Sequence, residues 1–127
     1  MFSYASPQPV VCGACSTEAT MSLWLIVSTH QPPPPFVTEG REQFHECPNC
    51  GALTIMVAPL IVMNIGGQPP MFLVPMATAS DEENRAAFNS LLDQVYATMG
   101  DAWRNEYLQN AEFIDRAQLR ELWPATD

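Results

Sequence analysis

The sequence predicts an α+β fold, in which a small antiparallel sheet precedes two or three C-terminal helices. Three observations support this prediction. Four cysteines form two Cys-x-x-Cys pairs in the first half of the chain. Residues 21–29 and 52–74 are rich in β-branched and other apolar side chains, which favour strands. From residue 80 onward, apolar residues recur at the spacing of an amphipathic helix.

The two cysteine pairs predict a metal site. Cys12 and Cys15 form the first pair, and Cys47 and Cys50 form the second. Two such turns facing each other make the four-sulfur tetrahedron that Zn²⁺ prefers. Because four thiolates leave no open coordination position, the zinc ion would support folding and not catalysis. We therefore expect a zinc-ribbon-type sheet with structural Zn²⁺ and no catalytic residue.

The two turns differ in their expected regularity. In the second turn, Pro48 fixes φ and Gly51 tolerates a positive φ, as a tight turn requires. In the first turn, Gly13 and Ser16 occupy the equivalent positions, so we expect a looser turn. The only histidines, His30 and His45, are not expected as ligands, because four cysteines already fill a tetrahedral site.

The sequence around the second pair resembles the CpXC-domain proteins of prokaryotes. The resemblance is carried by both cysteine pairs, by the long spacer, and by the run Phe44-His45-Glu46-Cys47-Pro48-Asn49-Cys50-Gly51. It extends from about residue 5 to residue 79. It implies that the four cysteines bind zinc, and it implies no activity, because the family's biochemical role is essentially unassigned.

The spacing of apolar residues predicts the remaining β-structure. Strands are expected at residues 21–29, 36–38, 43–46, 52–64 and 71–74. Pro59 is expected either to end the strand at residues 52–64 or to introduce a bulge in it. Four consecutive prolines from Pro32 to Pro35 predict a stiff connector within the spacer. A ligand for an SH3-type domain is the alternative interpretation of this run.

The C-terminal part has helix signals. Ser80 and Glu83 form a capping box that begins a helix at Asp81, and Gly100 offers its end. Asp101 is expected to cap a second helix. Asp115 and Gln118 are expected to form the capping box of a third helix. The expected division is a zinc-ribbon-like domain at residues 1–79 and a helical segment at residues 80–127 that packs on it.

The charge balance restricts the classes of partner. The chain has no lysine, and five arginines oppose fourteen acidic residues, which gives a net charge of −9. An acidic surface disfavours nucleic acid and anionic membranes. The N-terminus lacks the features of a signal peptide, and no apolar run reaches membrane-spanning length, so we expect a cytoplasmic protein.

These observations favour a non-catalytic, zinc-stapled protein–protein interaction module, such as a subunit or adaptor of a bacterial complex. Its partner would be another protein or a second copy, bound through the strand after the second cysteine pair and the C-terminal helices; Trp103 and Tyr107 are the expected aromatic contacts. No small-molecule substrate is inferred. Two alternatives remain: a redox or electron-transfer protein with a rubredoxin-like four-cysteine iron site, and a nucleic-acid-binding zinc ribbon.

Overall fold

The computed structural model describes residues 3–39 and 41–123. Residues 1, 2, 40 and 124–127 lie outside this description, so the first two residues of the expected domain 1–79 and the last four of the expected segment 80–127 are not described. The predicted α+β class is confirmed. A mostly antiparallel sheet is followed by C-terminal helices, one of which is long. The domain boundary at residue 79 stays a prediction.

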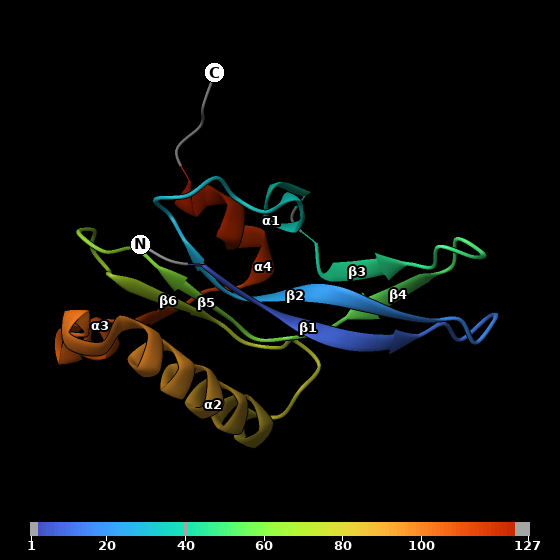
Figure 1. Ribbon diagram of the computed structural model, residues 1–127. Helices are drawn as coiled ribbons and strands as arrows, with labels where there is room; N and C mark the ends of the chain where they lie inside the picture. Colours follow the sequence, from blue (N-terminus) through green and yellow to red (C-terminus); the bar gives the residue numbers. More distant parts are fainter. Residues whose placement is uncertain (1–2, 40, 124–127) are drawn as a thin grey trace.

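The main sheet has five strands in the order β1-β2-β5-β6-β7 (Figure 1). Its strands are β1 (Tyr4–Val11), β2 (Glu18–Ser28), β5 (Leu60–Met63), β6 (Met71–Val74) and β7 (Glu112–Phe113). The pairs β1–β2 and β5–β6 are antiparallel, whereas β2–β5 and β6–β7 are parallel. The sheet is mixed because the chain leaves and re-enters it between β2 and β5 and again before β7.

The strands β3 (Gln43–Glu46) and β4 (Leu53–Met56) form a separate two-stranded antiparallel sheet, which we call the ribbon. The strand expected over residues 52–64 is interrupted before Pro59, and its two halves join different sheets as β4 and β5. Every side chain of β5 is buried. The apolar run therefore serves two sheets in succession.

The strand expected at residues 36–38 is wrong, because these residues belong to the short helix α1 (Pro35–Glu39). Pro35 occupies its first position, where the fixed φ of proline suits a helix and the missing N–H costs nothing. Phe36 and Val37 are buried against the main sheet. Tertiary packing thus overrides the strand preference of the β-branched residues.

The helix α2 (Asp81–Met99) covers one face of the main sheet, and α1 and α4 (Arg116–Leu119) lie on the other face (Figure 1). Each face has its own buried apolar cluster. The cluster on the α2 side contains Ile26, Ile61, Met63, Met71, Leu73, Phe88, Leu91, Leu92 and Val95. The cluster on the opposite side contains Val27, Phe36, Val37, Leu60, Val62, Phe72, Val74 and Leu119.

The beginning of α2 is as predicted. The Glu83 N–H donates to the Ser80 hydroxyl at 3.1 Å, and the Glu83 carboxylate accepts from the Ser80 N–H, which completes the capping box. After α2 come a 3₁₀ turn (Gly100–Ala102) and α3 (Asn105–Gln109). The second helix therefore begins at Asn105, and Asp101 lies within the 3₁₀ turn and does not cap it.

The second predicted capping box is also present. Asp115 and Gln118 exchange two hydrogen bonds between backbone N–H groups and side-chain oxygens, at 2.9 and 3.0 Å. A second 3₁₀ turn (Arg120–Leu122) follows α4, and the Trp123 indole N–H donates to the Gln31 carbonyl at 2.8 Å. Within the described residues, no helix is both long and apolar enough to cross a membrane.

Candidate metal centre

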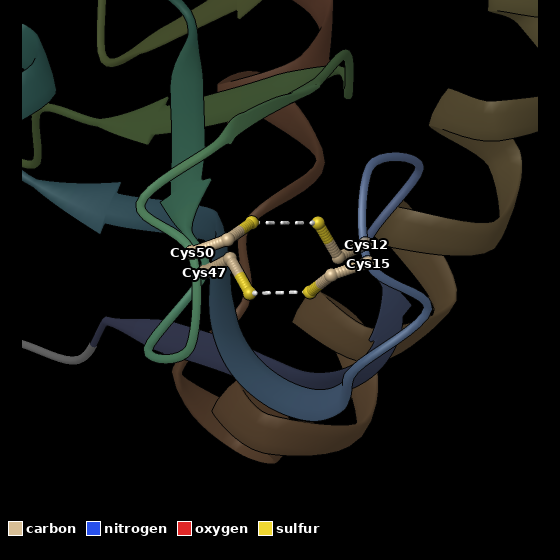
Figure 2. A group of neighbouring side chains, drawn as sticks. All are labelled: Cys12, Cys15, Cys47 and Cys50. Carbon is tan, nitrogen blue, oxygen red and sulfur yellow. Dashed lines mark hydrogen bonds between the residues drawn. The ribbon is translucent and has the colours of Figure 1, made fainter.

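The two cysteine pairs lie at the tips of two hairpins. Cys12 and Cys15 are in the turn between β1 and β2, and Cys47 and Cys50 are in the turn between β3 and β4. Figure 2 shows the two turns facing each other with the four sulfur atoms between them. The structure therefore brings together all four cysteines that the spacing selected.

Both turns have the same backbone hydrogen bonds. In the first turn, the Ser16 N–H donates to the Cys12 carbonyl at 2.9 Å, and the Cys12 N–H donates to the Thr17 carbonyl at 3.0 Å. In the second turn, Gly51 and Cys47 make the equivalent bonds, each at 2.9 Å. The greater looseness expected of the first turn is not seen in its hydrogen bonds.

The residue after each pair has a positive φ. Gly51 has a φ of 78°, and Ser16, at the equivalent position, has a φ of 63°. The left-handed region is strained for side chains with a Cβ atom, and glycine tolerates it. The first turn therefore adopts the geometry of the second with a serine in the glycine position.

This geometry predicts different outcomes for two glycine substitutions. Gly51→Ala is expected to lower the free energy of unfolding by about 1 kcal/mol, because alanine must adopt a left-handed φ. Gly13→Ala is the matched control, because its backbone is not left-handed and nothing lies within 4 Å of the added methyl group. It should be neutral or slightly stabilising. Equal loss of stability in both variants, measured by chemical denaturation, would contradict this account.

The distances between the sulfur atoms fit a tetrahedral metal ion. The Cys12 and Cys50 sulfurs are 3.5 Å apart, and the Cys15 and Cys47 sulfurs are 3.6 Å apart. All four sulfurs lie within 4.8 Å of one another. A tetrahedron with Zn–S bonds of about 2.3 Å has S–S edges of about 3.8 Å. The cluster is therefore compatible with one bound metal ion.

Hydrogen bonds favour the thiolate form on one side of the cluster. The Thr17 hydroxyl, 3.0 Å from the Cys15 sulfur, and the Asn49 side-chain amide, at 3.5 Å, lower the pKa of Cys15 from 9.0 to about 5. The N–H groups of Cys50 and Asn49 lower the pKa of Cys47. Such donors stabilise negative charge on sulfur.

Cys50 has the opposite shift. The Ala52 N–H lowers its pKa, but the neighbouring sulfurs of Cys15 and Cys12 outweigh this effect and raise the pKa of Cys50 to about 12. Thiolates so close together repel one another, so the last of them keeps its proton at neutral pH. A bound cation removes this repulsion. The pKa shifts of the cysteines and the distances between their sulfurs are therefore both compatible with a bound cation.

The cluster also shows which residues sequence reasoning missed. Among the described residues, the histidine, cysteine and acidic side chains close enough together to hold a metal ion are the four cysteines, so His30 and His45 are not among them. Thr17 and Asn49 were not predicted to contact a sulfur. Their positions, two residues after Cys15 and inside the second pair, are the sequence signal that identifies them.

Comparison of the chain with protein-family models, with curated proteins and with solved structures found no match.

Proposed function

We propose that this chain is a non-catalytic protein–protein interaction module stapled by one structural Zn²⁺ ion. The four sulfurs of Cys12, Cys15, Cys47 and Cys50 would hold the ion. When bound, zinc in such a site supplies folding free energy. Four thiolate ligands fill a tetrahedral coordination sphere, which supports a structural role. The proposed setting is a reducing cytoplasm, and the resemblance to CpXC-domain proteins stays a prediction.

The observation that carries the proposal is the distribution of exposed apolar side chains. Most of the large exposed apolar side chains lie in two regions of the surface. The first is the ribbon stripe, which consists of the exposed Leu53, Ile55 and Val57 and the partly buried Phe44. The second is the C-terminal groove, between α2, β6, β7 and α3. Exposed apolar surface of this kind marks interaction sites in soluble proteins.

The C-terminal groove has a volume of about 610 Å³ and walls that are mainly apolar. Its apolar lining consists of Leu73, Pro75, Phe88, Leu92, Leu108 and Phe113. Phe113 is 67% exposed, although its ring contacts Phe88 edge-on at a centroid distance of 6.1 Å. A large aromatic ring held in place and open to solvent is the type of residue that dominates binding energy at interfaces.

The aromatic residues selected from the sequence are less available for binding. Trp103 is partly buried and contacts the rings of Tyr96 and Tyr107 edge-on, with centroid distances of 4.6 and 5.5 Å. Tyr107 also packs against the cluster on the α2 side. Their truncation would remove packing within the chain as well as contacts to a partner. Phe113 is therefore the better test residue.

Affinity capture with the tagged, metal-loaded full chain tests the proposed function. We expect Phe113→Ser to reduce capture of a host protein at least tenfold, as substitution of a central interface aromatic does. Val11→Ser is the matched control, because Val11 is also highly exposed but lies on β1 away from the groove. If no protein is captured in a Phe113-dependent way, binding through the C-terminal groove is wrong.

A further inference from the structure

Two sulfur–sulfur contacts cross from one hairpin tip to the other. The Cys12 sulfur lies 3.5 Å from the Cys50 sulfur, and the Cys15 sulfur lies 3.6 Å from the Cys47 sulfur. Figure 2 shows that each of these sulfurs points across the gap toward its partner in the other turn. Four cysteines allow three pairings, and the structure favours the pairing in which both links join the two hairpins.

Each of these pairs combines an accessible sulfur with a buried one. Cys12 and Cys47 are both 4% exposed. Cys50, the partner of Cys12, is exposed, and Cys15, the partner of Cys47, is partly exposed. A small reagent from the solvent therefore reaches one cysteine of each pair first, and the other cysteine is already beside it. Redox-sensitive cysteines often have such a resolving cysteine as a neighbour.

A small movement converts either contact into a disulfide bond. The S–S distance of a disulfide is about 2.05 Å, so each gap must shorten by about 1.5 Å. All four cysteines lie at hairpin tips, and the exposed side chain of Cys50 has little packing to resist its rotation. The two disulfides would join the β1–β2 turn to the β3–β4 turn, which is the same connection that a bound metal ion makes.

We propose that the cysteine cluster is a redox switch, in which peroxide exchanges the bound metal ion for two disulfide bonds, Cys12–Cys50 and Cys15–Cys47. This inference rests on the metal centre of the proposed function. Oxidation removes the thiolate ligands, so the chain releases the ion, but the two hairpins stay joined. The output of the switch is therefore metal release without loss of the fold.

The oxidant is hydrogen peroxide. The Cys50 thiolate attacks one peroxide oxygen, the O–O bond breaks, and hydroxide leaves, which gives a sulfenic acid. The Cys12 thiolate then attacks the Cys50 sulfur, and the S–O bond breaks as a second hydroxide leaves. The two sulfurs have lost two electrons and the peroxide has gained them. Cys15 and Cys47 react in the same way with a second peroxide molecule.

The charge of the chain and the contacts of Cys15 affect this chemistry. The net charge of −9 favours an uncharged oxidant over anionic ones such as peroxynitrite. The Thr17 hydroxyl and the Asn49 amide stabilise negative charge on the Cys15 sulfur, which makes it a weaker nucleophile. Cys50 is the more exposed of the two accessible cysteines. We therefore expect the Cys12–Cys50 bond to form first.

The arginine distribution provides a direct test of the pairing. Trypsin cleaves after lysine and arginine, the chain has no lysine, and Arg41 is the one arginine between the two cysteine pairs. Digestion without reductant therefore separates residues 1–41, which contain the first pair, from residues 42–85, which contain the second. After the metal-loaded full chain is treated with hydrogen peroxide, mass spectrometry should find these two peptides linked by two disulfides. Fragmentation between the cysteines of each pair should assign Cys12–Cys50 and Cys15–Cys47.

Metal release and folding are measured on the same samples. A chromogenic chelator should detect complete zinc release at about two molecules of peroxide per chain. The circular dichroism spectrum should match that of the parent, and dithiothreitol with Zn²⁺ should restore the metal content. Oxidation in denaturant with a chelator is the matched control. It should give a mixture of pairings, including links within each Cys-x-x-Cys pair, because the hairpin tips are no longer held together.

Three results would overturn the switch: links confined within the Cys-x-x-Cys pairs, the same single pairing in the denatured control, or full retention of zinc in excess peroxide. Loss of the circular dichroism signal on oxidation would show that the disulfides do not replace the ion. A chain that contains zinc and gives the wrong links contradicts the switch alone. A chain without zinc before oxidation contradicts the structural ion as well, whereas absence of Phe113-dependent capture contradicts the interaction module alone.

Discussion

Cys47→Ser is expected to abolish stable metal binding and to lower the melting temperature by more than about 10 °C. Cys47 is 4% exposed, and its sulfur belongs to the cluster that joins the two hairpins. An isolated two-stranded hairpin is marginal in water, and the ribbon has only two strands. Without the metal, the ribbon should lose its order first, while the clusters on the main sheet retain part of theirs.

Metal analysis, absorption spectra and circular dichroism measure this outcome. The parent chain should be colourless and contain one zinc ion, whereas a red protein containing iron would contradict zinc and favour electron transfer. Ala14→Ser is a suitable control, because Ala14 is exposed between the ligands of the first pair. It adds one hydroxyl group and removes no ligand. A Cys47→Ser variant that kept the metal content and melting temperature of the parent would rule out the site.

Leu119→Ala is expected to lower the free energy of unfolding by about 2–4 kcal/mol. Leu119 is 1% exposed and belongs to the cluster on the face of the sheet opposite α2. Removing most of its side chain leaves a cavity between α4 and strands that are buried on both sides. The effect is large for a residue so late in the chain, because α4 completes the cover of that face.

Leu108→Ala provides the matched control for Leu119→Ala. It makes the same chemical change at a leucine that is 38% exposed, so it should cost less than about 1 kcal/mol. Chemical denaturation followed by circular dichroism gives both values. If the two substitutions cost the same, α4 does not pack on the sheet as described.

The cysteine cluster was predictable because its signal is local. Cys-x-x-Cys spacing places two sulfurs at one point whatever the rest of the chain does, and two pairs at the tips of two hairpins can meet. The donors Thr17 and Asn49 were not predicted. Their contacts to Cys15 depend on the shape of each turn and, for Asn49, on the approach of the other hairpin.

The starts of α2 and α4 were predictable for the same reason. The capping boxes at Ser80 and Asp115 involve residues three positions apart, and both are present. The strand order was not predictable from such local patterns. The parallel pairing of β2 with β5 and of β6 with β7 joins distant segments, and no local spacing encodes it.

The exposed apolar side chains show a second limit of sequence reasoning. An apolar residue in a strand is equally consistent with a buried or an exposed face until the neighbouring layers are known. Ile55 and Ile61 lie in the same apolar run, yet Ile55 is exposed and Ile61 is fully buried. Phe113 is exposed for a similar reason, because β7 is a two-residue edge strand.

The placement of helices on both faces of the sheet has a consequence for synthesis. The chain crosses from one face to the other at β7, after α2 has covered the first face. The second face, with Val62 and Phe72, is not fully covered until α4 has been made. In chains that are still growing on the ribosome, the central strands are therefore covered on one face and partly exposed on the other. During that interval the exposed apolar face can associate with other chains.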